Sequence, residues 1–153
     1  MPKCFIQTPL VVVKYTKNRG QGGRAVFARK NIDRGTLIEW APCLMIPEDE
    51  IGFDFKQVLP WYVFEWSNKM NCLALGYISL YNHSYEPNAY YEMNEPDCIT
   101  IWAGESIVKG DEITINYNGD PTDQTPVGFK IDGESTGGKI MRRGIKPLYP
   151  LKT

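Results

Sequence analysis

The sequence has no long apolar run. None of its hydrophobic stretches approaches the roughly 20 residues that a helix needs to cross a bilayer. Its first seven residues lack the apolar segment and the small-residue cleavage site of a secretory signal. We therefore predict a soluble, intracellular protein without membrane contact, which is cytoplasmic, or nuclear in a eukaryotic, viral or host setting. The length of 153 residues predicts a single domain.

Metal-binding side chains are scarce as well. The chain has one histidine, His83, and four cysteines that form no Cys-x-x-Cys pair, namely Cys4, Cys43, Cys72 and Cys98. Structural zinc usually requires four clustered cysteine or histidine ligands. We therefore expect no metal site and interpret the cysteines as scattered, buried thiols of a reducing compartment.

The net charge is only −1, but it is unevenly distributed. Residues 86–123 carry one lysine against nine aspartates and glutamates, whereas residues 1–35 are strongly basic. An acidic block of this kind suits a cationic peptide and argues against direct nucleic-acid binding. The alternative is a solvated face whose charge is balanced by the basic ends in three dimensions.

Short β-branched and alternating segments, separated by turns rich in glycine and proline, predict a mostly-β domain. We expect strands at 10–15, 25–28, 36–40, 44–46, 98–103 and 112–117. Residues 55–67 instead space their apolar side chains by three and one, which predicts an amphipathic helix that starts near Pro60. Residues 72–81 indicate mixed coil and short helix, and the Gly-rich basic residues from 133 to 144 indicate a lid or an arm.

Three familiar chemistries are not supported. His83 and Ser84 are adjacent in sequence, and such neighbours rarely form a productive nucleophile–base pair. Residues 20–25, Gly-Gln-Gly-Gly-Arg-Ala, match neither the dinucleotide pattern nor a phosphate-binding loop. A carboxylate pair for acid–base chemistry exists at Asp111 and Glu112. It lies at an expected turn, and we interpret both side chains as solvated.

Three motifs nevertheless occur in a fixed order. A glycine turn precedes 25–28, the sequence Asn-His-Ser-Tyr-Glu-Pro-Asn occupies 82–88, and Gly-Asp-Glu-Ile-Thr-Ile-Asn-Tyr occupies 110–117. In this combination the chain resembles the SET-domain lysine methyltransferases, in particular the minimal bacterial and viral type, from about residue 10 to about 120. The resemblance implies a β-clip of several small sheets with a short helical insert and a knot-like C-terminal segment. It implies a SET domain at 1–120 with a variable insert at about 47–75, and an extension at 121–153 that closes the site or is partly mobile. The Cys-x-Cys zinc cluster that follows many such domains is missing.

The resemblance also assigns cofactor contacts. Gly23, Arg24 and Ala25 correspond to the turn that meets S-adenosylmethionine through main-chain atoms, although the family usually has Gly-x-Gly here. Asn82 and His83 resemble the pair that holds the cofactor's adenine and amino-acid ends. An ordinary hairpin turn and a buried core histidine are the structural alternatives.

Tyrosines carry the expected chemistry. Tyr117 resembles the catalytic tyrosine, which orients a deprotonated lysine amine and also borders the cofactor. Tyr91 corresponds to a position that influences how many methyl groups are added, and its hydroxyl predicts mainly monomethylation. Phe129 or Tyr149 would close over the adenine, with Phe129 assigned to the cofactor site. Tyr117 could alternatively be a core aromatic at a strand end.

The expected function is methyl transfer from S-adenosylmethionine to a lysine of a cationic protein or peptide, for which a histone is one candidate. The competing interpretation is a non-catalytic module of the same fold that binds a peptide or protein partner. A homodimer is also compatible with the sequence.

Overall fold

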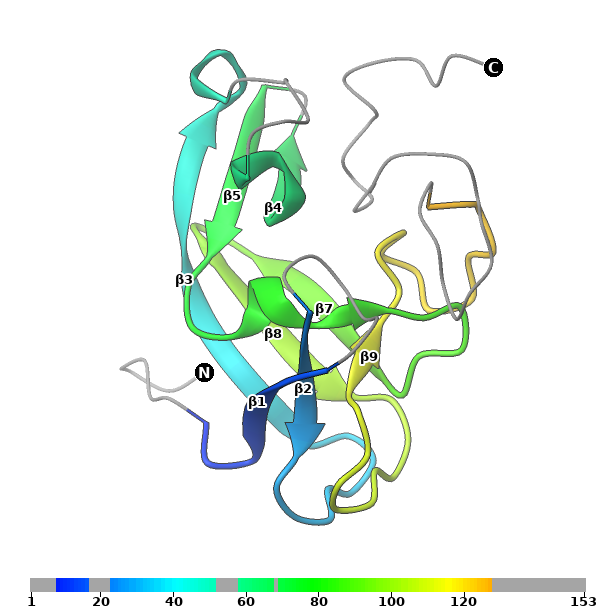
Figure 1. The fold of residues 1–153 in the computed structure, drawn as a ribbon. Helices are drawn as coiled ribbons and strands as arrows, with labels where there is room; N and C mark the ends of the chain where they lie inside the picture. Colours follow the sequence, from blue (N-terminus) through cyan, green and yellow to red (C-terminus); the bar gives the residue numbers. More distant parts are fainter. Residues whose placement is uncertain (1–7, 17–22, 52–57, 68, 128–153) are drawn as a thin grey trace.

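The computed structural model describes residues 8–16, 23–51, 58–67 and 69–127, and in these residues three small sheets form the fold (Figure 1). The elements are β1 (Val11–Tyr15), β2 (Arg24–Ala28), β3 (Leu37–Pro47), η1 (Glu48–Glu50), η2 (Leu59–Trp61), β4 (Val63–Ser67), β5 (Met70–Ala74), η3 (Ile78–Leu80), β6 (Asn82–His83), β7 (Ala89–Asn94), β8 (Cys98–Ala103) and β9 (Thr114–Ile115). The predicted fold class, mostly β with several small sheets, is confirmed.

The largest sheet has the order β4-β5-β3-β8-β7, and β3 is its longest strand. The first half of β3 pairs with β8, and its second half, from Cys43 onward, pairs with β5. A single strand therefore joins the β7–β8 hairpin to the β4–β5 hairpin, which lie toward opposite ends of β3 (Figure 1). The predicted strands at 36–40 and 44–46 are two parts of this one element.

The other two sheets are pairs. Strands β1 and β2 are antiparallel, and the amide of Thr16 donates to the carbonyl of Gly23 at 2.7 Å. Strands β6 and β9 are parallel, with Asn82 opposite Thr114 and His83 opposite Ile115. Two segments about 30 residues apart in the chain are thus held side by side, as the resemblance implied.

The predicted helix at 55–67 is wrong over its second half. Leu59–Trp61 form a single 3-10 turn with Pro60 in its first positions, and Val63–Ser67 form strand β4, which pairs with β5. Consecutive Val63 and Phe64 are both buried, and they pack into different clusters. Because both faces of β4 carry buried apolar residues, their spacing in the sequence resembles that of an amphipathic helix. Residues 52–57 lie outside the described part.

Residues 72–81 are also more extended than predicted. Their first part belongs to β5, and only Ile78–Leu80 form a helical turn, η3.

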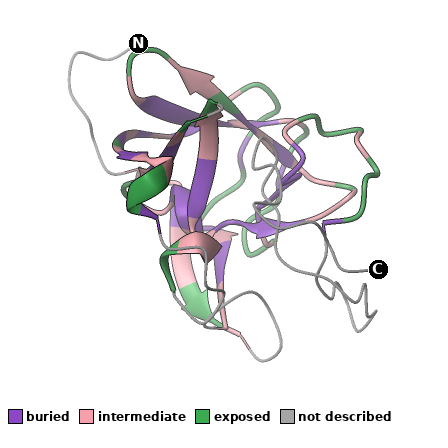
Figure 2. Ribbon diagram, turned by 90° about the horizontal axis from the view of Figure 1, so that it is seen from above, coloured by how far each residue is buried: buried purple, intermediate pink, exposed green. Residues whose placement is uncertain are grey.

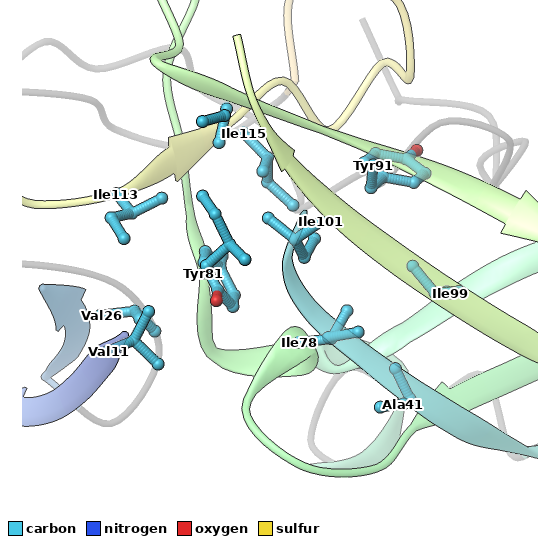
Figure 3. Close-up of a cluster of buried hydrophobic side chains, with 14 of the residues drawn as sticks. Val11, Val26, Ala41, Ile78, Tyr81, Tyr91, Ile99, Ile101, Ile113 and Ile115 are labelled. Carbon is cyan, nitrogen blue, oxygen red and sulfur yellow. The ribbon is translucent and has the colours of Figure 1, made fainter. Parts of the chain in front are cut away.

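One main core fills the space between the sheets. Figure 2 shows buried residues concentrated along the strands and exposed residues at the turns. Isoleucines of η3, β8 and the β9 region surround Tyr81, which is fully buried (Figure 3). This core fixes the segment that leads directly into β6. No helix in the described part of the chain is long and apolar enough to span a bilayer.

Candidate active site

The β6–β9 pair is the framework of the candidate site, and Asn88 fastens it. The Asn88 amide donates from Nδ2 to the carbonyl of Glu112 at 2.8 Å, and its Oδ1 accepts from the amide of Thr114 at 2.9 Å. A side-chain amide carries one acceptor and two donor hydrogens, so it can pair with a backbone segment as another strand would. This contact explains why an asparagine six residues after Asn82 matters for the position of β9.

His83 is buried within this framework and orients Tyr117. Its Nδ1 accepts a hydrogen bond from the backbone amide of Tyr117 at 2.9 Å, and its ring packs edge-on against the rings of Tyr85 and Tyr117. Burial lowers the pKa of His83 to about 4. The ring is therefore neutral near pH 7, and because Nδ1 accepts, its proton lies on Nε2. The side chain acts here as an acceptor for the backbone of Tyr117.

Asn82 joins the site to the glycine turn. Its Nδ2 donates both to the carbonyl of Arg24 at 3.0 Å and to Oε1 of Glu112 at 2.9 Å. Both amide hydrogens are thereby used, and Oδ1 is the polar atom of this side chain that remains for a ligand N–H group. Glu112, which the sequence indicated as solvated, is half-buried and holds the Asn82 amide in one orientation.

The glycine turn adopts the backbone that a close approach requires. Gly23 has φ of +64°, and an added Cβ would lie 3.1 Å from the carbonyl of Thr16. Ala25 pairs with Lys14 within β2, so it has the extended backbone that any residue adopts. The departure of this chain from Gly-x-Gly therefore causes no strain at residue 25.

The side chain of Arg24 extends from the glycine turn to the predicted variable insert at about 47–75. Its Nη2 donates to the hydroxyl of Tyr62 at 2.9 Å, and its guanidinium lies 5.9 Å from the centroid of the same ring. Its buried Nε has no hydrogen-bond partner among the residues that the structure describes.

The two predicted tyrosines lie together. The hydroxyl of Tyr117 donates to the carbonyl of Tyr81 at 2.6 Å, and the hydroxyl of Tyr91 lies 3.5 Å from the carbonyl of Tyr117. Tyr91 also packs edge-on against Phe64 of β4, with ring centroids 5.2 Å apart. Tyr117 and Tyr91 are 5% and 8% exposed, so both hydroxyls act in a largely desolvated environment.

Sequence reasoning missed the carbonyl of Tyr81. Tyr81 directly precedes the Asn-His-Ser motif, and the sequence gives no reason to expect more of it than a core aromatic. Its main-chain oxygen becomes relevant only because folding brings Tyr117 against it. No pattern of residue types signals a backbone acceptor.

Further predictions concerned metal ligands, the cysteines and the C-terminal aromatic residues. In the described ranges no group of three or more histidine, cysteine, aspartate or glutamate side chains could hold a metal ion. Cys43, Cys72 and Cys98 are buried, as expected. Cys4, Phe129 and Tyr149 lie outside the described residues.

Comparison with known proteins assigns the segment that contains this site to a family. The SET-domain family matches residues 23–118, from the glycine turn through Tyr117. The chain belongs to the SET-domain family.

Three relatives of this SET-domain protein carry related names. A Schizosaccharomyces pombe protein, "Histone-lysine N-methyltransferase, H3 lysine-37 specific", is 32% identical over 114 residues, which cover 73% of this chain and 75% of the relative. The Saccharomyces cerevisiae "Histone-lysine N-methyltransferase SET5" is 30% identical over 109 residues, which cover 67% of this chain but 20% of that protein. A crystal structure of a Plasmodium falciparum protein described as a histone methyltransferase has 32% identity and a TM-score of 0.61, covering 75% of this chain and 97% of its own.

The predicted family and β-clip fold are thus confirmed, together with the enzyme class, protein-lysine methyltransferase. The roles of individual residues in this SET domain rest on the contacts described above.

Proposed function

We propose that this SET domain transfers a methyl group from S-adenosylmethionine to a lysine of a histone, with Tyr117 as the central catalytic residue. The observation that carries the proposal is the convergence of Tyr117, the carbonyl of Tyr81 and the Asn82–His83 segment. The β6–β9 pairing brings together the two segments from which these groups come.

Gly23, Arg24, Ala25, Asn82 and His83 would hold the cofactor. Gly23 lets main-chain atoms approach a ligand, and Oδ1 of Asn82 can accept from an amine. The Arg24 guanidinium, with its unpartnered Nε, fits a carboxylate such as that of the methionine moiety. The Asn82 acceptor and the Arg24 cation thus match the ammonium and the carboxylate at the amino-acid end of S-adenosylmethionine. Phe129 remains our candidate for a residue that closes over the adenine.

The cofactor supplies a methyl group on a cationic sulfonium, and the acceptor must be a neutral amine. A lysine has a pKa of about 10.4, so deprotonation near pH 7 costs roughly 4–5 kcal/mol in water. Desolvation between Tyr91 and Tyr117 lowers that cost, because burial disfavours the ammonium form. No strong side-chain base is required, which agrees with a neutral His83 whose Nδ1 is already occupied.

Tyr117 and the Tyr81 carbonyl position the amine. A hydroxyl and a main-chain oxygen 2.6 Å apart offer two acceptors that can direct the amine's hydrogens and leave its lone pair aligned with the methyl group. Alignment of this kind can supply several kcal/mol of barrier lowering. The hydroxyl of Tyr91 narrows the same space, and we propose that it limits the product mainly to monomethyl-lysine.

A cationic substrate agrees with the surface charge. All nine acidic residues between 86 and 123 lie in the described part, and none of them is buried. They can therefore face a basic segment such as a histone tail, which is also what the names of the relatives indicate. A nuclear location would follow from such a substrate. The domain division at residue 120 and a homodimer stay predictions.

The test is methyl transfer from labelled S-adenosylmethionine to recombinant histone H3, to the other core histones, and to an H3 tail peptide with or without its lysines replaced by arginine. We expect label in lysine-containing H3 alone, and its loss in Asn82→Ala but not in Glu50→Gln, which changes an exposed acid outside the 86–123 block. Binding of the tail peptide without any methyl transfer would instead favour the non-catalytic module.

A further inference from the structure

Glu39 is a buried acid that the proposed chemistry has not used. It lies on β3, is 4% exposed, and accepts hydrogen bonds at both carboxylate oxygens. Oε1 accepts from the backbone amide of Tyr77 at 2.7 Å, and Oε2 accepts from the hydroxyl of Tyr81 at 2.8 Å. Both partners are donors, which is the arrangement that an ionised, acceptor-only carboxylate requires.

A β-bulge in β3 lies directly before Glu39. The pairing of β3 with β8 shifts between Leu37, opposite Trp102, and Glu39, opposite Ile101, so one residue is inserted at Ile38. An ideal strand would direct Ile38 and Glu39 to opposite faces, yet both are buried. Glu39 lies on the same side of β3 as Ala41, because a Cβ at Gly76 would lie 2.7 Å from Oε1 of Glu39 and 3.6 Å from the Cβ of Ala41.

The neighbouring loop is built around this carboxylate. Gly76 has φ of +69°, and a Cβ at this position would lie 2.7 Å from Oε1 of Glu39. An L side chain is thus excluded both by the backbone conformation and by the carboxylate itself. The position of the Glu39 carboxylate therefore requires glycine at residue 76.

Glu39 holds both ends of η3, and η3 leads into the site. The amide of Tyr77 precedes η3 and the side chain of Tyr81 follows it, while the carbonyl of Tyr81 accepts from the hydroxyl of Tyr117 at 2.6 Å. A continuous series of short hydrogen bonds runs from Glu39 through Tyr81 to Tyr117. Figure 3 shows Tyr81 at the centre of the packed cluster, with Ile113 and Ile115 of the β9 segment on one side.

We propose that Glu39 is a positioning residue for methyl transfer, which fixes the Tyr81 carbonyl and thereby the Tyr117 hydroxyl. The inference rests on the proposed function. Burial of a carboxylate works against folding and raises the pKa of Glu39, although its two hydrogen bonds act in the opposite direction. A buried acid of this kind costs stability, and such groups are characteristic of functional sites.

The test is Glu39→Gln, compared with Tyr81→Phe, the double variant and the control Glu50→Gln, which changes an exposed acid outside the 86–123 block. Glutamine has nearly the same shape, but its NH₂ group cannot accept from either donor. We expect kcat to fall about tenfold in Glu39→Gln, with KM for peptide and cofactor within about twofold and an unchanged or higher Tm. Tyr81→Phe should lower kcat similarly, and the double variant should be no slower than the slower single variant, because both changes break the same contact.

Three results separate the interpretations. Unchanged kcat in Glu39→Gln overturns the positioning role. A fall in kcat that is matched by a fall in Tm, or by failure to fold, also overturns it, because Glu39 is then structural only. Absence of turnover in the unmodified protein refutes the proposed function instead.

Discussion

The buried, neutral His83 makes the stability of this domain depend on pH. The pKa of His83 falls from its ordinary value of 6.5 to about 4 because the ring is desolvated. The unfolded chain therefore binds a proton below about pH 6.5 that the folded chain binds only near pH 4. Stability is fully present above pH 6.5 and is lost as the pH falls through this window.

The magnitude follows from the two pKa values. Lowering the pH from 7 to 5 should reduce the free energy of unfolding by about 2 kcal/mol through His83 alone. Since the chain has a single histidine, no other imidazole contributes. Glu39 acts in the opposite direction, because its raised pKa favours the folded state as the pH falls. The measurement must therefore compare two proteins that both contain Glu39, so that its contribution cancels.

The assay is urea denaturation at pH 7, 6 and 5, followed by tryptophan fluorescence, for the intact protein and for His83→Asn. Asparagine keeps an acceptor for the amide of Tyr117 but does not titrate in this range. The stability difference between the two proteins should change by about 2 kcal/mol between pH 7 and 5. Parallel pH profiles would refute the conclusion that His83 is buried in its neutral form, whatever the absolute stability of the variant.

Further predictions concern the framework and the product. Asn88→Ala removes two hydrogen bonds to the β9 segment, and thermal unfolding should show a loss of roughly 2–4 kcal/mol, since two backbone groups lose their partner. Gly76→Ala should lower Tm more than Gly35→Ala does, because both glycines have positive φ but only Gly76 has the carboxylate of Glu39 within reach of a Cβ. Tyr91→Phe should shift the product from monomethyl- toward di- and trimethyl-lysine in mass spectrometry.

One result would contradict each of these three predictions. If Asn88→Ala were as stable as the unmodified protein, β9 would not depend on the two hydrogen bonds of Asn88. Equal Tm values for the two glycine variants would show that the carboxylate can move aside. Mainly trimethyl-lysine from the unmodified protein would contradict the role of Tyr91.

Much of the site could be predicted because its residues occur in compact motifs. The sequence from Asn82 to Asn88 and the one ending at Tyr117 pointed to one family, and the structure pairs them as β6 and β9. That pairing came from the resemblance and not from local pattern, because no periodicity in either segment specifies a parallel partner 30 residues away.

What the sequence could not predict depends on tertiary contacts. The apolar spacing at 55–67 fitted a helix, but two-sided burial of β4 produces the same spacing. Glu39 lies in the predicted strand at 36–40, and nothing in the residue type indicates that its carboxylate is buried against Tyr77 and Tyr81. Glu112 was interpreted as solvated at a turn, yet it fixes the amide of Asn82. In each case the decisive neighbour is remote in sequence.

The central claim is that Tyr117 acts on the transfer step, and one variant tests it most directly. Tyr117→Phe removes only the hydroxyl that lies 2.6 Å from the Tyr81 carbonyl, and Tyr90→Phe on β7 is the matched control. Calorimetry should show S-adenosylmethionine binding within about threefold of the unmodified protein, while kcat for the histone substrate falls about 100-fold, as for loss of one preorganised polar contact in an active site. Equal kcat in Tyr117→Phe and Tyr90→Phe would contradict the claim.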